Sequence, residues 1–278
     1  MAPLYRTAFA GEPWMDRCPG CGFCRVQPLP AQFGAAYEDA YTAGPEAERK
    51  NRRLAPDYLR KIRPHLPAAP FRFLEIGGAH GWLAQTVRDE CRADVLLLEP
   101  GRSAVAAAQA RGLRAQAGEL ETFVAERPFD VLCAAHVIEH VADAAAFLEA
   151  CRRALRPGGI LLLLTPNAAA WKLAHFRRSW AWASPQEHTL LLSAEAAARL
   201  LAPRGFEPVF VRGYRPAFAH YPFFLARWLA EWRTRHGLPW VRWLTRPLAL
   251  VEFALLVGLD QFLGARRADE LLIVARRV

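Results

Sequence analysis

Short apolar runs alternate with segments of helical spacing between residues 71 and 165. The apolar runs are continuous, which is typical of parallel strands that are buried on both faces. This order predicts an α/β sheet whose right-handed crossovers bring the carboxyl ends of the strands to one edge. The expected strands are 71–76, 94–99, 113–117, 129–135 and 159–164, and the expected helices are 82–91, 102–111, 119–126 and 141–156.

The pattern continues on both sides of this region. A charged, helix-prone segment at 46–66 precedes the first strand and is expected to cover the same edge of the sheet. Downstream, Ser193 is expected to cap a helix that ends near Pro203, and the last two strands are expected at 206–211 and 270–275. The resulting division of the chain is an irregular segment (1–45), one domain (46–213 with 269–278) and a helical insert (214–268).

The turn after the first expected strand carries the first sign of chemistry. In Glu75-Ile-Gly-Gly-Ala-His-Gly81, three glycines lack a Cβ, so the backbone can bend sharply and a ligand can lie against it. The helix that follows offers free N–H groups. Glu99 ends the next strand, where a carboxylate can accept both ribose hydroxyls of an adenosine. These features predict a nucleotide-type cofactor site, although the G-G-x-x-G spacing differs from the dinucleotide fingerprint.

Further motifs follow in order along the chain. They are Gly118-Glu-Leu-Glu121, Val137-Ile-Glu-His-Val141, the strand that ends in Thr165-Pro-Asn167, and Pro185-Gln-Glu-His-Thr-Leu-Leu-Leu-Ser193. Together with the glycine turn they resemble the class I S-adenosylmethionine-dependent methyltransferases, in the small-molecule branch that includes quinone and sugar methyltransferases. The resemblance covers about 54–211 and the last strand. It implies a Rossmann-like seven-stranded sheet, mostly parallel with an antiparallel last strand.

The resemblance also implies S-adenosyl-L-methionine as cofactor. Ala79 stands where the family has its middle glycine. Glu99 takes the place of the ribose-binding acid, Glu119 lies beside the adenine, and the backbone of His136 borders the cofactor. The implied cofactor-binding residues are Glu75, Gly77, Gly78, Gly81, Glu99, Glu119 and His136.

Candidates for the acceptor side follow from the chemistry of methyl transfer. If the acceptor is a hydroxyl, a base must remove its proton, and histidine suits this task near neutral pH. His188, in the loop before the Ser193 helix, is the first candidate for base or for orienting the substrate. His140 and Glu139 are weaker candidates, because His140 can simply hold its turn and Glu139 can orient it. Substrate contacts are expected at Asn167 and Trp171, and no motif indicates a catalytic metal.

The net charge, the basic residues and the cysteines limit which partners and which compartment we expect. The net charge is +9, but only three of the 36 basic residues are lysines, and the arginines are spread along the chain. Thr165-Pro-Asn167 does not match the Asn/Asp-Pro-Pro-Tyr/Phe motif that the resemblance would imply for a flipped base, so no nucleic-acid partner is expected. Scattered cysteines and the lack of an opening apolar segment predict a cytoplasmic protein.

Two segments stay open to more than one interpretation. Cys18 and Cys21 form half of a zinc knuckle, to which Cys24 could add a third ligand at an unusually tight spacing. We interpret the three cysteines as a relic with packed or free thiols rather than a metal site. The insert is rich in Trp and Arg. It is either a helical subdomain packed on the core or in a homodimer contact, or a substrate lid, or a hairpin that contacts a membrane surface through 221–263.

The leading hypothesis is methyl transfer from S-adenosylmethionine to a small molecule, at a hydroxyl of a saccharide or of a lipid-like quinone precursor. The preference for oxygen rests on family analogy. The alternative is a non-catalytic binding module that keeps the fold and uses the insert for partner or membrane contact. A nicotinamide oxidoreductase is disfavoured by the missing fingerprint and by the expected antiparallel last strand.

Overall fold

The computed structural model describes residues 2–5, 14–28, 45–176, 180, 182–215, 237, 267–278 and part of 247–264. Their main element is a seven-stranded sheet with the order β10-β11-β8-β7-β4-β5-β6. Only β11 runs antiparallel to its neighbours in this sheet, so the predicted mostly parallel sheet with an antiparallel last strand is confirmed. The strands are β4 (Arg72–Ile76), β5 (Asp94–Glu99), β6 (Ala115–Ala117), β7 (Phe129–Ala135), β8 (Leu155–Pro166), β10 (Phe206–Tyr214) and β11 (Glu270–Arg277).

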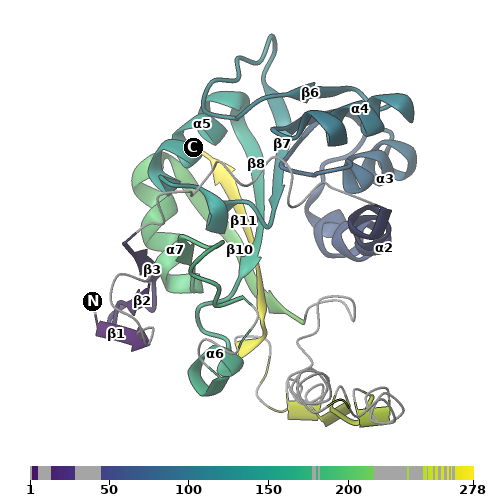
Figure 1. Cartoon of the computed structure of the whole chain (residues 1–278). Coiled ribbons are helices and arrows are strands. Elements are labelled where there is room, and N and C mark those ends of the chain that lie inside the picture. The colour runs from purple at the N-terminus through teal and green to yellow at the C-terminus, as the bar shows by residue number, and fades with distance from the viewer. Residues whose placement is uncertain are drawn as a thin grey trace.

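Helices cover both faces of this sheet (Figure 1). Alternate strand residues point to opposite sides, so Phe73 packs in the core beneath one set of helices and Leu74 in the core beneath the other. The first set is α2 (Pro45–Ile62), α3 (Trp82–Cys91) and α4 (Arg102–Ala110), and the second is α5 (Ala144–Ala154) and α7 (Ala194–Leu201). The Ser193 hydroxyl accepts a hydrogen bond from the Ala196 N–H at 3.0 Å, which confirms the predicted cap of α7.

One predicted helix is wrong. Residues 119–126 form a turn and irregular chain, because their packed apolar residues, Leu120, Phe123 and Ala125, do not repeat at helical spacing and Val124 is 85% exposed. The helix predicted at 141–156 begins at Ala144, since the Asp143 carboxylate caps the Ala145 and Ala146 N–H groups.

The prediction of an irregular segment at 1–45 is also wrong in part. Three strands, β1 (Ala2–Tyr5), β2 (Trp14–Arg17) and β3 (Cys24–Gln27), form an antiparallel sheet with β9 (Leu190–Leu191). Met15, Cys24 and Val26 face a small core that α6 (Trp171–Phe176) and Trp180 complete. The partners that order these strands are thus more than 140 residues away in the sequence.

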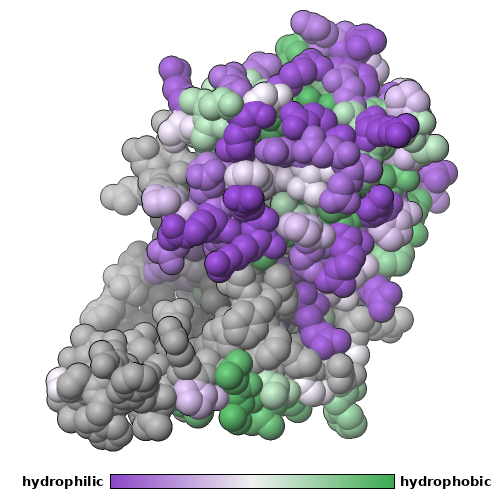
Figure 2. All heavy atoms as spheres, turned by 90° about the vertical axis from the view of Figure 1, so that its right-hand side faces the viewer, coloured by the Kyte–Doolittle hydropathy of each residue, from purple (hydrophilic) through white to green (hydrophobic). Residues whose placement is uncertain are grey.

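Most of the insert lies outside the described residues, including the tryptophans and arginines on which its interpretation rests. Within 247–262, Leu250, Val251, Leu255 and Phe262 are exposed by more than half of their surface. Figure 2 shows hydrophobic residues gathered at the lower end of the molecule, where this segment lies in Figure 1. None of the helices in the described ranges has the length and apolar character needed to span a bilayer. Lid, dimer contact and membrane contact stay predictions.

Candidate functional site

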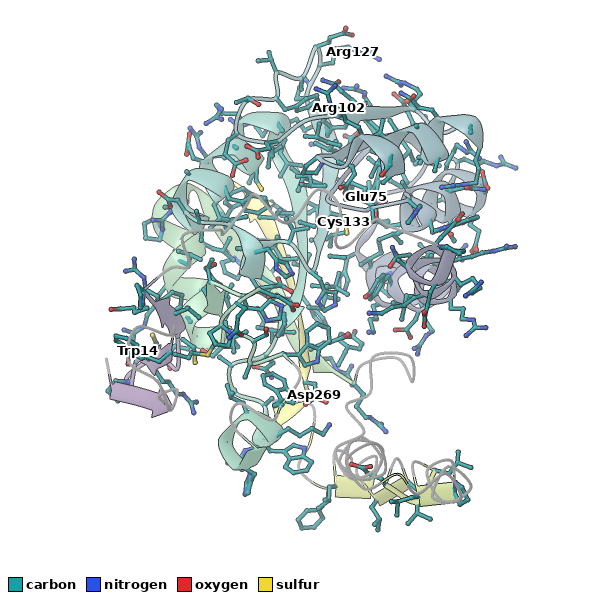
Figure 3. The ribbon with its side chains drawn as sticks, viewed as in Figure 1. Trp14, Glu75, Arg102, Arg127, Cys133 and Asp269 are labelled. Atoms are coloured by element: carbon teal, nitrogen blue, oxygen red, sulfur yellow. The ribbon has the colours of Figure 1, made fainter. Side chains whose placement is uncertain are left out.

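The glycine turn between β4 and α3 is closely packed. Glu75, at the end of β4, accepts a hydrogen bond from the Ala84 N–H at 2.8 Å, and burial raises the pKa of this carboxyl to about 8. A Cβ on Gly78 would lie 2.3 Å from the Glu75 carboxyl carbon, and one on Gly77 would lie 2.7 Å from Val137. Gly77 also has a φ of +62°. The sequence therefore needs glycines here to bring the turn over the Glu75 carboxylate, which lies near the middle of the sheet in Figure 3.

Glu99 reaches the same turn from the adjacent strand β5. Its carboxylate accepts hydrogen bonds from the Ala79 N–H at 2.8 Å and from the Gly101 N–H at 3.0 Å. Burial raises the pKa of Glu99. Glu119 lies exposed just beyond β6, the next strand along the edge. The acidic residues predicted for the cofactor thus follow consecutive strands, and their contacts with the cofactor stay predictions.

Ala79 occupies a left-handed backbone conformation, with a φ of +49°. This conformation costs an L-residue about 1–2 kcal/mol, while glycine adopts it freely but loses about 0.5–1 kcal/mol of chain entropy on folding. We expect Ala79→Gly to raise the free energy of unfolding by up to ~1 kcal/mol, measured by urea denaturation. Gly112 is a matched control. Its φ is +74° and nothing lies within 4 Å of an added Cβ, so Gly112→Ala should lower stability through the backbone alone. A destabilised Ala79→Gly variant would contradict the strain at this turn.

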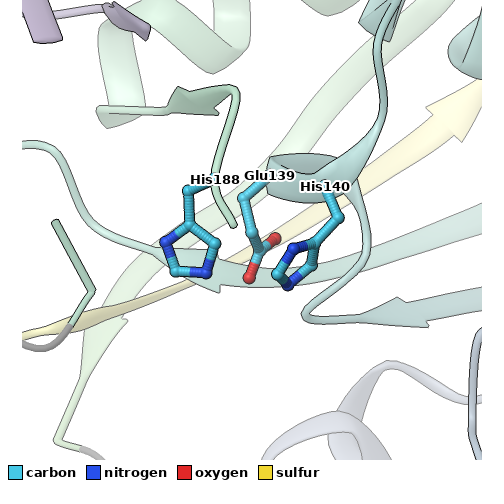
Figure 4. Close-up of side chains that lie close together, drawn as sticks. All are labelled: Glu139, His140 and His188. Atoms are coloured by element: carbon cyan, nitrogen blue, oxygen red, sulfur yellow. The ribbon is translucent and has the colours of Figure 1, made fainter. Parts of the chain in front are cut away.

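The acceptor-side candidates come together. Glu139 and His140 lie in the short 3-10 turn after β7, and His188 lies in the loop before β9. One ligand-type atom from each of the three side chains lies within 4.8 Å of the other two. Figure 4 shows the Glu139 carboxylate between the two imidazole rings. Thr189 joins the two loops, because its N–H donates to the Glu139 carbonyl at 2.7 Å. We call these three residues, Glu139, His140 and His188, the Glu-His-His cluster.

The electrostatics differ within the Glu-His-His cluster. Burial opposes ionisation of Glu139, but the hydrogen bond from His136 and the nearby imidazoles outweigh it and lower its pKa to about 2. Burial lowers the pKa of His188 to about 4, against the attraction of Glu139. At neutral pH the cluster therefore holds an ionised carboxylate beside a neutral His188. The His188 Nδ1 donates to the Trp182 carbonyl at 2.6 Å, and the His140 Nδ1 donates to the Glu187 carbonyl at 2.8 Å.

His136 was predicted to border the cofactor with its backbone, and its side chain turns into a buried charge network. Its Nδ1 lies 3.1 Å from Glu139 Oε1, and its Nε2 lies 3.5 Å from Glu270 Oε1. Burial favours the neutral ring, but the hydrogen bonds with both glutamates prevail and raise the pKa of His136 to about 9. Lys61 pairs with Glu270 at 2.5 Å. The Trp182 ring stacks on His136 with centroids 4.7 Å apart.

The two residues predicted to contact the substrate have structural roles. The Asn167 side chain donates to the Ala268 carbonyl at 2.8 Å and accepts from the Ala169 N–H at 2.9 Å, so it holds the chain segment that leads into β11. Trp171 begins α6 and is buried, with the Lys172 ammonium 5.4 Å from its ring centre. Substrate binding by Asn167 and Trp171 stays a prediction.

Sequence reasoning missed Lys61 and Lys172. Both are buried, and each pairs with a carboxylate that precedes or begins β11, Glu270 and Asp269 respectively. A signal was present, because Lys61 and Lys172 are two of only three lysines in this Arg-rich chain. Among the cysteines, Cys24 packs in the small core and burial raises its pKa to about 12, while Cys18 and Cys21 are half-buried.

Comparisons with known proteins agree with one another. A family model described as a methyltransferase domain matches residues 47–211, which is more than half of the chain. The ubiquinone biosynthesis O-methyltransferase of Dinoroseobacter shibae is 29% identical over 184 residues, which are 58% of this chain and 70% of that protein. A probable S-adenosylmethionine-dependent methyltransferase of Mycolicibacterium smegmatis is 32% identical over 169 residues, 59% of each chain.

Solved structures show the same fold at lower identity. Phosphoethanolamine N-methyltransferase 2 of Haemonchus contortus, in complex with phosphomonomethylethanolamine and S-adenosylhomocysteine, has a TM-score of 0.55 at 18% identity, covering 80% of this chain and 52% of that one. A putative methyltransferase in complex with the Haloferax volcanii Trm112 activator has a TM-score of 0.56 at 15% identity. The match covers 83% of this chain and 95% of that one.

Proposed function

The chain belongs to the class I S-adenosylmethionine-dependent methyltransferases, and we propose that it methylates a hydroxyl of a saccharide or of a lipid-like quinone precursor. S-adenosyl-L-methionine is the methyl donor, and a small molecule is the acceptor. The observation that carries the hydroxyl assignment is the Glu-His-His cluster at the strand ends beside the glycine turn. Relatives named ubiquinone biosynthesis O-methyltransferases support a quinone precursor.

The proposed reaction is an in-line displacement. The acceptor oxygen loses its proton, a new C–O bond forms to the sulfonium methyl, and the C–S bond breaks with its electron pair going to sulfur. The protein must hold the oxygen against the methyl and keep bulk water out. Family membership makes the non-catalytic alternative the weaker hypothesis.

The Glu-His-His cluster is our candidate for taking the proton. Because the His188 Nδ1 donates to a carbonyl, Nε2 is the basic nitrogen of that ring. The ionised Glu139 stabilises positive charge on either imidazole. A hydroxyl bound within reach of the His188 Nε2 would thus be oriented and deprotonated as the methyl arrives.

The cofactor half of this proposal is tested by calorimetric titration with S-adenosylhomocysteine. We expect micromolar binding to the wild-type chain. Glu99→Ala should weaken it by about 100-fold, because the variant loses two charge-assisted hydrogen bonds to the ribose and also the acceptor for the Ala79 and Gly101 N–H groups. Glu126→Ala, an exposed glutamate on the turn before β7, is the matched control and should bind like wild type.

The acceptor half needs a transfer assay with methyl-labelled cofactor over sets of glycans, catechol-type quinone precursors and amines. Label in an ether product of a hydroxyl acceptor supports the proposal. Transfer only to nitrogen or carbon acceptors would contradict it, and a folded protein that binds no cofactor would contradict the cofactor site itself.

A further inference from the structure

Each member of the Glu-His-His cluster makes a hydrogen bond with a group outside the cluster. The His140 Nδ1 donates to a backbone carbonyl, and so does the His188 Nδ1. The Glu139 carboxylate accepts from the Thr165 hydroxyl at 3.0 Å and from the His136 Nδ1 at 3.1 Å, one bond to each oxygen. Outer hydrogen bonds of this kind orient the ligands of metal sites, with imidazoles donating to carbonyls and carboxylates themselves hydrogen-bonded.

The hydrogen bonds also fix the tautomers. A carbonyl oxygen can only accept, so Nδ1 carries the proton in both rings. In the neutral imidazole the lone pair is then on Nε2, which is the form that binds metal ions. The carboxylate keeps unused lone pairs on both oxygens, because each oxygen accepts only one of the two bonds above. The three side chains therefore present two imidazole nitrogens and one carboxylate oxygen.

We propose that Glu139, His140 and His188 bind one divalent transition-metal ion, of the kind that accepts two imidazoles and a carboxylate and leaves coordination positions open. Zn²⁺, Fe²⁺ and Mn²⁺ all take such ligand sets. Typical metal–ligand distances of about 2.0–2.2 Å require the three groups to draw together by about 1 Å. His140 is only half-buried, whereas Glu139 and His188 are buried, so the ion enters from the His140 side.

The ion gives the acceptor side a defined task. With the ion bound, the His188 Nε2 lone pair is a metal ligand, so the ion takes over from His188 the activation of the acceptor. The open positions would hold the acceptor oxygen, and the positive charge would favour its deprotonated form. This role rests on the proposed function, whereas binding of the ion does not. An experiment can therefore contradict the binding of the ion without contradicting the proposed function, and the reverse.

The test uses Co²⁺ with the full chain, freed of metal by a chelator. Co²⁺ bound by imidazole and carboxylate gives d–d bands in the visible range, and Co²⁺ bound by cysteine adds a thiolate charge-transfer band in the near ultraviolet. We expect one equivalent of Co²⁺ to give d–d bands without the thiolate band. His188→Ala and, separately, His140→Ala should weaken binding by about 100-fold or more, since loss of even a supporting partner costs 10–100-fold.

Three controls make the result decisive. S-adenosylhomocysteine binding by each variant shows that it is folded. His65→Ala removes a histidine that packs on Phe210, away from the cluster, and should bind Co²⁺ like wild type. Cys21→Ser should also leave binding unchanged. A thiolate band that disappears in Cys21→Ser, or wild-type Co²⁺ binding by folded His188→Ala, overturns the proposal, and so does a wild-type chain that binds S-adenosylhomocysteine and no Co²⁺.

Discussion

Glu139→Gln is expected to lower kcat/KM for methyl transfer by at least about 100-fold while S-adenosylhomocysteine affinity stays within about three-fold of wild type. Glutamine keeps the shape of the side chain and can still accept from the Thr165 hydroxyl. It removes the negative charge that faces His136, His140 and His188. The loss should fall on the acceptor step, because Glu139 has no contact with the glycine turn among the described hydrogen bonds.

A matched control and a second readout separate electrostatics from misfolding. Glu187 lies one residue before His188 and is exposed, and its backbone carbonyl, not its carboxylate, accepts from His140. Glu187→Gln should therefore stay near wild-type activity. By NMR titration the pKa of the His136 ring should fall from about 9 in Glu139→Gln, since one of its two carboxylate partners is gone. Retained activity in Glu139→Gln would remove this residue from the mechanism.

The ion pair between Glu139 and His136 predicts how the stability of the fold depends on pH. The fold lowers the pKa of Glu139 from 4.5 to about 2. Its contribution to stability is therefore fully present above pH 4.5 and is lost as the pH falls toward 2. His136 has its pKa raised from 6.5 to about 9, so its contribution is present below 6.5 and is lost as pH rises through 9. The pair should stabilise the fold most between pH 4.5 and 6.5, by an amount on the order of 3 kcal/mol for their shared interaction. Urea denaturation across pH should show this maximum flattened in Glu139→Gln.

Lys172→Met is expected to cost about 3–5 kcal/mol of unfolding free energy, because it removes one partner of a buried ion pair. Both side chains of this ion pair are 0% exposed. Asp269 directly precedes β11 and lies at the lower end of the sheet in Figure 3. The pair therefore holds the residue before β11 against α6.

Two further variants test this explanation by urea denaturation. In Lys172→Met/Asp269→Asn the buried charge is removed as well, so part of the loss should be recovered. Arg199→Met breaks the surface pair with Glu195, whose side chains are 66% and 54% exposed, and should change stability by less than about 0.5 kcal/mol. A Lys172→Met variant as stable as Arg199→Met would show that the ion pair does not hold the fold.

The parts of the fold that the sequence predicts correctly are those whose evidence is local. Continuous apolar runs mark β4, β5, β7 and β8, and glycines mark the turn above Glu75. The N-terminal strands are not predicted from the sequence, because their apolar residues are buried only through contacts with distant elements, α6 and β9. The false helix at 119–126 has the opposite origin, since its composition favours helix but its packed residues, Leu120, Phe123 and Ala125, do not lie on one helical face.

The candidate site, like the fold, is only partly predictable from the sequence. Glu139, His140 and His188 each follow from a motif, but His140 and His188 lie 48 positions apart in the sequence. Their meeting depends on Thr189 bonding to the Glu139 carbonyl and on β9 pairing with β3. Glu270, Lys61 and Thr165 join the network from three different elements, and no spacing rule connects them.

The place of β11 has a consequence for the order in which the molecule can be built. This strand follows β10 and the insert in the sequence, yet it lies inside the sheet, with β8 on one side and β10 on the other. A chain emerging from the ribosome can form the half that contains the glycine turn, since β4 to β8 are contiguous in sequence apart from their crossovers. β10 cannot join the sheet until β11 has been synthesised, because β11 lies between β10 and β8. The nascent protein would thus form the glycine turn before its two buried ion pairs with Lys61 and Lys172, because Glu270 and Asp269 are synthesised with β11.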